Sequence, residues 1–127
     1  MKSVPSQFFA TAAIFALIGM LWGIQMSASQ DHSLSPAHGH LNLIGFVTMS
    51  LYAIYYALTP QAAGSRLAKI HYYLTLIMVL VMVPGIYLAI AEEQDMLAKL
   101  GSVLAVLSMA LFLYMIFRFG VGVRKED

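Results

Sequence analysis

The chain has 127 residues, of which 61% are hydrophobic and only 10% are charged, and its mean hydropathy is +0.80. A soluble domain has about a quarter of its residues charged, so this chain cannot cover a water-facing surface and lipid must be its main solvent. The net charge of +1 gives no reason to expect a nucleic-acid partner, and the absence of cysteine excludes disulfides, thiolate metal sites, iron–sulfur clusters and c-type haem attachment.

Four apolar runs follow one another along the chain. The length of each is close to that of a helix that spans a bilayer core, which is about 20 residues. Short polar or charged connections separate them, so consecutive helices are expected to be antiparallel neighbours. The sequence therefore predicts one all-α transmembrane domain over residues 1–127. We expect its four helices at about 7–27, 36–58, 67–91 and 97–118.

The first run carries no charge, and we expect it to be a retained membrane helix. The alternative is a cleaved signal peptide, but the run is long for one and Ser27-Ala28-Ser29 is a poor cleavage site. Ser35-Pro36 reads as the N-cap and first residue of the second helix. The third helix contains Pro84-Gly85, which predicts a kink. The fourth has small residues for close helix contact: Gly101, Ser102, Ala105, Ser108 and Ala110.

The basic residues predict the orientation of the chain. Six of the seven fall on one side of the four-helix topology, and only Lys99 falls on the other. Cytoplasmic segments carry the excess of Lys and Arg, so we expect both termini and the middle loop in the cytoplasm, in a bacterial-type inner membrane. The six are Lys2, Arg66, Lys69, Arg118, Arg124 and Lys125.

Two of the four histidines, His38 and His40, stand in the first turns of the second helix. Ionisable residues at membrane depth are rare and usually functional. Residues two apart on a helix are rotated by about 200°, so these imidazoles point to opposite sides and cannot easily hold one metal ion together. They can each serve a different site, or they can simply bond water and headgroups. Gly39 between them would let a flat cofactor approach the backbone.

Asn42 shares a helix face with His38, at positions i and i+4. Its amide can fix a tautomer or a propionate, and it can equally make a hydrogen bond between helices. His71 is expected about one turn into the third helix, near the cytoplasmic face. It is either an interfacial histidine or a possible second site, a quinone pocket near the residues Tyr56, Tyr72 and Tyr73.

The segment from Pro36 to Phe46 reads Pro-Ala-His-Gly-His-Leu-Asn-Leu-Ile-Gly-Phe. It resembles the Ala-His-x-His helix of the haem–copper oxidase catalytic subunit, and also small four-helix relatives and nitric-oxide-responsive haem membrane proteins of that superfamily. In the oxidases, twelve helices form three arcs of four around a pseudo-threefold axis, and the second helix of each arc carries histidines. The resemblance implies that this chain is an up-down antiparallel arc, equivalent to one third of that subunit.

The resemblance further implies a homotrimer. His38 of one protomer and His40 of the next would be the axial ligands of a haem b iron between subunits, with Gly39 and Asn42 as further cofactor-binding residues. A bis-His haem is coordinatively saturated, which suits electron transfer or redox sensing more than binding a gas. The expected partners are membrane lipid and a quinone or a redox partner protein.

The chain departs from the oxidases where oxygen chemistry is concerned. They have three histidines for copper. Here, apart from His32 in the outer loop, only His71 is left, and it lies roughly 20 Å away in depth, at 1.5 Å of rise per residue. No copper site is visible, which argues against oxygen reduction and leaves open whether the chain is an enzyme. Two alternatives stay open: a quinol- or nitric-oxide-related redox enzyme with an open haem site, and a non-haem structural or accessory membrane protein.

Overall fold

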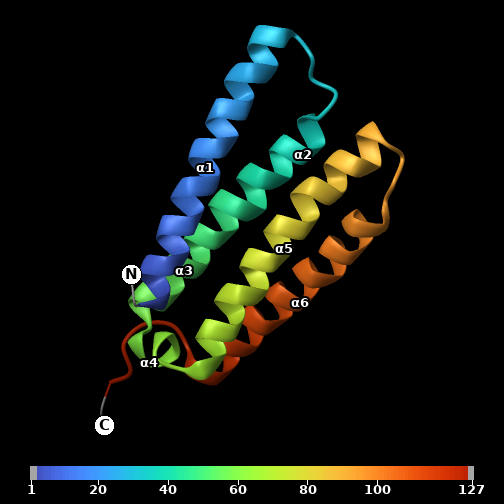
Figure 1. The fold of residues 1–127 in the computed structure, drawn as a ribbon. Helices are drawn as coiled ribbons and strands as arrows, with labels where there is room; N and C mark the ends of the chain where they lie inside the picture. The colour runs from blue at the N-terminus through green and yellow to red at the C-terminus, as the bar shows by residue number, and fades with distance from the viewer. Residues whose placement is uncertain (1–2, 126–127) are drawn as a thin grey trace.

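The computed structural model describes residues 3–125, and the regular elements in that range are helices (Figure 1). The second apolar run forms one continuous rod whose backbone changes from α to π and back to α. The elements are α1 (Val4–Ser29), α2 (Ser35–His40), the π-helix η1 (Leu41–Thr48), α3 (Met49–Leu58), the single turn α4 (Pro60–Ala63), α5 (Arg66–Ala91) and α6 (Met96–Phe119).

Four helical spans are long and apolar enough to cross a membrane: Val4–Ser29, Ser35–Leu58, Arg66–Ala91 and Met96–Phe119. Each begins and ends within one turn of the predicted position. The all-α fold with four transmembrane helices is therefore confirmed, and the chain has the architecture of a multi-pass membrane protein.

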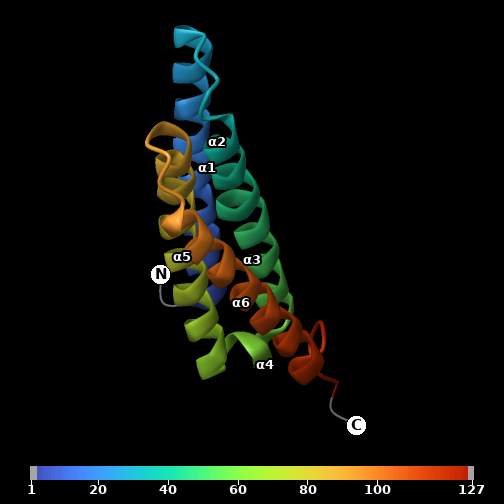
Figure 2. The same cartoon turned by 90° about the vertical axis from the view of Figure 1, so that its right-hand side faces the viewer.

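The two ends of the bundle differ in charge. The N-terminus, the C-terminus and α4 lie at one end, and the loops after α1 and α5 lie at the other, which is the up-down topology expected (Figures 1 and 2). The end with the termini carries the basic residues at 66, 69, 118, 124 and 125, and the opposite end carries the acids Asp31, Glu92, Glu93 and Asp95. Lys99 pairs there with Asp95 at 3.1 Å. Lys2, also used to predict the orientation, lies outside the described residues.

Local hydrogen bonds set where the helices begin. Ser3 Oγ accepts from the Ser6 amide, and Ser65 Oγ accepts from the Ala68 amide at 3.2 Å, so both long helices α1 and α5 start with a side-chain cap. The prediction that Ser35 caps the second helix is wrong by one position. Ser35 is already helical, and its hydroxyl donates to the carbonyl of His32 at 2.7 Å, which competes with the capping role.

The loop between α1 and α2 is ordered by its own polar side chains. The Ser33 amide donates to Asp31 Oδ1 at 3.0 Å, and this backbone hydrogen bond lowers the pKa of the Asp31 carboxyl. Together with the bond from Ser35 to His32, it fixes the chain where it enters α2. The histidine pair on α2 is thereby held at the end of the bundle opposite the termini.

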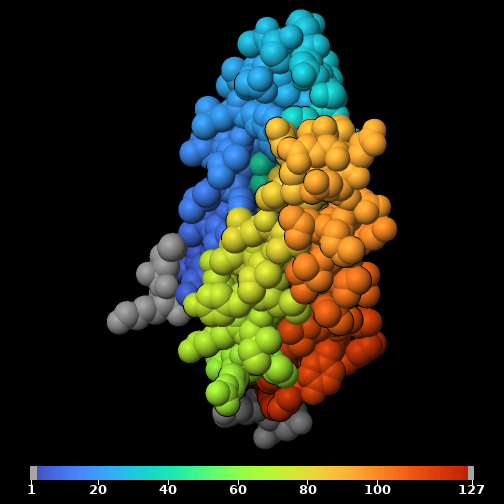
Figure 3. Space-filling model, turned by 45° about the vertical axis from the view of Figure 1, so that its right-hand side comes forward, coloured from blue at the N-terminus to red at the C-terminus, as the bar shows by residue number. Residues whose placement is uncertain are grey.

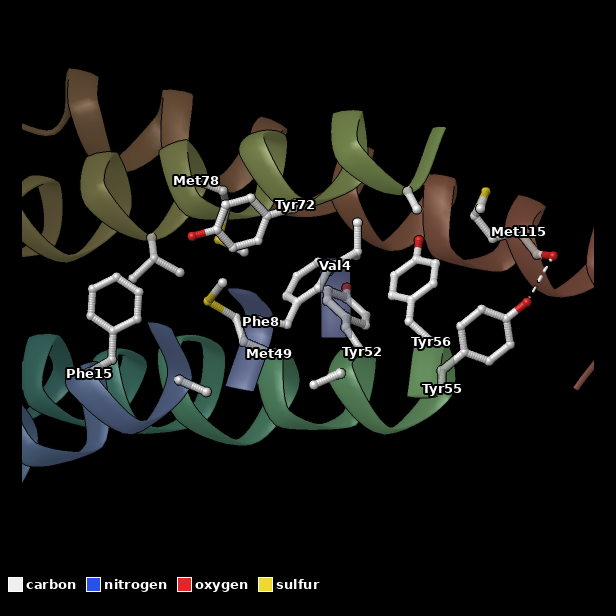
Figure 4. Close-up of a cluster of buried hydrophobic side chains, with 14 of the residues drawn as sticks. Val4, Phe8, Phe15, Met49, Tyr52, Tyr55, Tyr56, Tyr72, Met78 and Met115 are labelled. Carbon is white, nitrogen blue, oxygen red and sulfur yellow. Dashed lines mark hydrogen bonds between the residues drawn. The ribbon is translucent and has the colours of Figure 1, made fainter. Parts of the chain in front are cut away.

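The main core lies in the half of the bundle that holds the termini, and all four spans contribute to it. Phe8 of α1 and Tyr52 and Tyr56 of α3 are buried between the helices, and Tyr55 Oη donates to the carbonyl of Met115 on α6 at 3.1 Å (Figure 4). Tyr52 also contacts Phe112 of α6, with ring centroids 4.6 Å apart. Aromatic rings rather than aliphatic chains therefore fill much of this core.

Glycines bring α5 and α6 together. A Cβ added to Gly85 would lie 2.6 Å from the Ala98 amide nitrogen, and one added to Gly101 would lie 2.7 Å from Met82 Cα. Pro84 lies inside α5, which continues through it to Ala91. Of the small residues expected at this contact, Gly101 and Ser108 are buried, Ala105 is half-buried, and Ser102 and Ala110 face outward.

Replacing Gly85 with alanine should destabilise the contact between α5 and α6. The new methyl group would meet backbone rather than a flexible side chain, so the helices must separate, at a cost of roughly 1–3 kcal/mol. Thermal unfolding in detergent, followed by circular dichroism, measures the loss. Gly64→Ala is the matched control, because its Cβ would lie at an ordinary 3.5 Å from the Pro60 carbonyl oxygen. An equal loss in both variants would contradict this account.

Candidate functional site

His38 turns towards α1 of its own chain. Its Nε2 lies 2.9 Å from the carbonyl oxygen of Gly19, and the Trp22 indole stands edge-on to its ring at 5.8 Å between centroids. A carbonyl oxygen can only accept a hydrogen bond, so Nε2 must carry a proton and donate. In this arrangement Nε2 is not available as a lone-pair ligand.

Two glycines on α1 make room for this contact. A Cβ on Gly19 would collide with the Asn42 side chain, and one on Gly23 would lie 3.3 Å from His38 Nε2. The pairs are in register, because Gly19 and Gly23 are four residues apart on one helix and His38 and Asn42 are four apart on the other. The two glycines were not among the predicted contact residues, although Gly-x-x-x-Gly is a known signal for close helix packing in membranes.

Asn42 also takes part in the contact between His38 and α1. Its Nδ2 donates to the His38 carbonyl at 3.2 Å and lies 3.3 Å from His38 Nε2. Since that Nε2 is itself a donor towards Gly19, the bond to the carbonyl is the one that holds. Asn42 therefore lies beside His38, as its spacing predicts, and it packs against α1 at Gly19.

His40 is held differently. Its Nδ1 lies 2.7 Å from the Pro36 carbonyl oxygen, within the same helix, so Nδ1 carries the proton and the Nε2 lone pair remains available. The ring is half-buried. Metal-binding histidines almost always donate one ring nitrogen to such a partner, which fixes the tautomer and orients the other nitrogen. A Cβ on the neighbouring Gly39 would meet no described atom within 4 Å, so the backbone between the histidines is open.

A π-helix follows the histidines directly. The segment η1 runs from Leu41 to Thr48, and the Thr48 hydroxyl donates to the carbonyl of Leu43, five residues earlier, at 2.9 Å. Most π-helices are single-turn insertions, frequently at functional sites. Here the wider turn begins where Asn42 takes up the His38 carbonyl. The apolar pattern of this segment predicted a helix but not its π-helical form.

His71 lies apart from the pair on α2, in the core at the other end of the bundle. It is fully buried, and its Nδ1 lies 2.8 Å from Tyr56 Oη. Thr75 donates to the His71 carbonyl at 2.7 Å, so Ser108, 2.7 Å away, must donate to Thr75. Ser108 Oγ can then accept from His71 Nε2 at 3.5 Å, which leaves Nδ1 to accept from Tyr56. The four side chains form one directed chain across α3, α5 and α6.

The arrangement around His71 bears on the expected quinone pocket. The structure brings Tyr56 and His71 together, but both are fully buried and bonded to each other. Tyr72 instead bonds Thr11 at 2.7 Å, and Tyr73 faces the surface. A quinone head could reach His71 only if the aromatic core opened. His71 is thus a buried core histidine and not an interfacial one.

Replacing Tyr56 with phenylalanine should cost about 1–3 kcal/mol, because it leaves the buried Nδ1 of His71 without a hydrogen-bond donor. The ring stays in the core, and only the hydrogen bond to His71 Nδ1 is lost. Thermal unfolding in detergent gives the difference from the unmodified protein. Tyr73→Phe is the control, because the Tyr73 ring is 55% exposed and should be neutral. A loss that is as large at Tyr73 as at Tyr56 would contradict the role given to this bond.

Among residues 3–125, no three side chains of His, Asp or Glu gather into a group that could hold a metal ion. A haem iron needs only one or two imidazoles from the protein, so this finding does not bear on haem. The donor set on α2 fits that group in part: His40 is already in a ligand-like state, whereas His38 would have to leave Gly19. No family model, no curated protein and no solved structure matches the chain.

Proposed function

We propose that this chain is a membrane haem b protein that transfers single electrons or senses redox state. The haem would lie between protomers of a homotrimer, with His38 of one protomer and His40 of the next as axial ligands. The bond from His40 Nδ1 to the Pro36 carbonyl carries the proposal, because it leaves Nε2 in the state that an iron ligand needs. Haem supplies the one-electron chemistry, and the chain would hold and orient it.

The different partners of the two histidines support a site between chains. His38 faces α1 and bonds Gly19, whereas His40 bonds only within its own helix among the hydrogen bonds described. One chain therefore does not direct both imidazoles to one point. To become a ligand, His38 would exchange the Gly19 carbonyl for the iron, and its proton would move from Nε2 to Nδ1. The open backbone at Gly39 would accept a flat ring system.

A second candidate is a redox enzyme with an open haem site, acting on a quinol or on nitric oxide. The observation that favours it is the same bond from His38 to Gly19. If His38 keeps that bond, His40 is the only protein ligand and the opposite face of the iron stays open to a small molecule. If His38 serves only to join α1 and α2, the chain has a structural or accessory role without haem.

Optical spectra of the purified protein, produced with ample haem, test these functions. A sharp low-spin b-type spectrum that carbon monoxide changes little supports the first. A large change with carbon monoxide supports the second. A colourless preparation would overturn both. Native mass measurement in detergent tests the trimer, and reporter fusions at the two termini test the proposed cytoplasmic location of both ends in a bacterial inner membrane.

A further inference from the structure

We propose that the groove between α1 and α5 is a binding site for one acyl chain of a membrane phospholipid. The groove has a volume of about 190 Å³. It is lined by Ile18 and Trp22 from α1, by Leu80, Val83 and Pro84 from α5, and by Leu41 of η1. Figure 3 shows the hollow between α1 in blue and α5 in yellow, with the second span visible at its bottom.

The chemistry of the walls selects hydrocarbon. Every residue that lines the groove is apolar, apart from the single indole N–H of Trp22. All three elements belong to membrane spans, so the open side of the groove faces the interior of the bilayer. Apolar cavities stay dry, and an empty one loses the dispersion contacts of its walls. Acyl chains are the most abundant molecules at this depth that can fill it.

The depth of the groove fits a lipid whose headgroup stays at the membrane surface. Trp22 lines it, and Tyr87 lies one turn beyond Pro84 on α5, 43% exposed. Tyrosine and tryptophan concentrate at the level of the headgroups, so these two residues mark the outer mouth of the groove. A chain that enters beside Trp22 runs inward between Ile18 and Leu80 without burying any polar group.

A second copy of the protein fits the groove less well. A helix with its side chains is about 10–12 Å across, so a neighbouring span could place little more than a side chain in a space of 190 Å³. A flexible acyl chain can fill the whole length of the groove. This inference does not depend on haem or on the roles of His38 and His40.

Trp22 is the only tryptophan in the chain, which makes it a specific reporter. The protein is reconstituted in phosphatidylcholine that contains rising fractions of the same lipid brominated on its acyl chains, and Trp22 fluorescence is measured. We expect quenching that saturates at a low fraction of brominated lipid, on top of a linear part from surrounding lipid. Val83→Phe and the less disruptive Leu80→Phe should fill the groove and remove the saturable part. Leu100→Phe on the exposed face of α6 is the matched control, because Leu100 does not line the groove, and it should behave as the unmodified protein.

Native mass spectrometry supplies a second readout that haem absorption does not affect. We expect one retained phospholipid per chain in the unmodified protein and in Leu100→Phe, and none in the two groove variants. The proposal is overturned if quenching is linear in the unmodified protein, or if the groove variants retain the same lipid. It is also overturned if these variants change the number of chains per particle while lipid retention is unchanged, because a second copy would then fill the groove.

Discussion

Replacing His40 with alanine should abolish haem binding. His40 already has the donor bond and the available Nε2 of an iron ligand, whereas His38, the other histidine of α2, is bonded to the Gly19 carbonyl. Loss of a group that only hydrogen-bonds a metal ligand lowers metal affinity by about 10–100-fold, so loss of the ligand itself should lower the affinity further. The measurement is the ratio of haem to protein after purification, with His32→Ala in the outer loop as the control.

His38→Ala distinguishes the two haem functions. If the haem is held by two histidines, this variant loses the low-spin spectrum, as His40→Ala does. If the site is open, the variant keeps its haem and its spectrum, because His38 of the unmodified protein is bonded to Gly19 and does not bind the iron. Should His71→Ala alone remove the haem, the ligand assignment is wrong.

Replacing His71 with leucine should destabilise the fold by about 2–4 kcal/mol. The variant leaves the buried Tyr56 hydroxyl without an acceptor, at about 1–3 kcal/mol, and it loses the contacts of the imidazole with Tyr52 and Phe112. Hydrogen bonds between membrane helices average only about 0.6 kcal/mol, so the stranded hydroxyl and the lost packing dominate. Unfolding in detergent, by heat or denaturant, measures the change.

The double variant His71→Leu with Tyr56→Phe supplies the control for that result. Removing both partners leaves neither of them unsatisfied. The double variant should therefore lose less unfolding free energy than the sum of the losses in the two single variants. Strict additivity would mean that the 2.8 Å contact between Tyr56 Oη and His71 Nδ1 contributes nothing.

The sequence by itself determined the four spans and nearly all of their ends. The length of an apolar run is a local property, and it decides whether a segment crosses a bilayer wherever its neighbours lie. The polar and charged segments that separate the runs are local as well, and for that reason the predicted bounds lie within one turn of α1, α5 and α6. The opposite directions expected for the His38 and His40 side chains also follow from their spacing along one helix, and the structure gives the two imidazoles different partners.

Only the tertiary structure decided what those side chains face. His38 meets Gly19 because α1 packs against α2 in one register, and His71 lies in the core because α5 is rotated towards α3 and α6. The rotation and register of a helix depend on contacts made at every other position along it, so no short pattern specifies them. The groove beside Trp22 has the same origin. The chain's composition requires a bilayer as its surroundings, and helix packing decides where a groove opens towards the lipid.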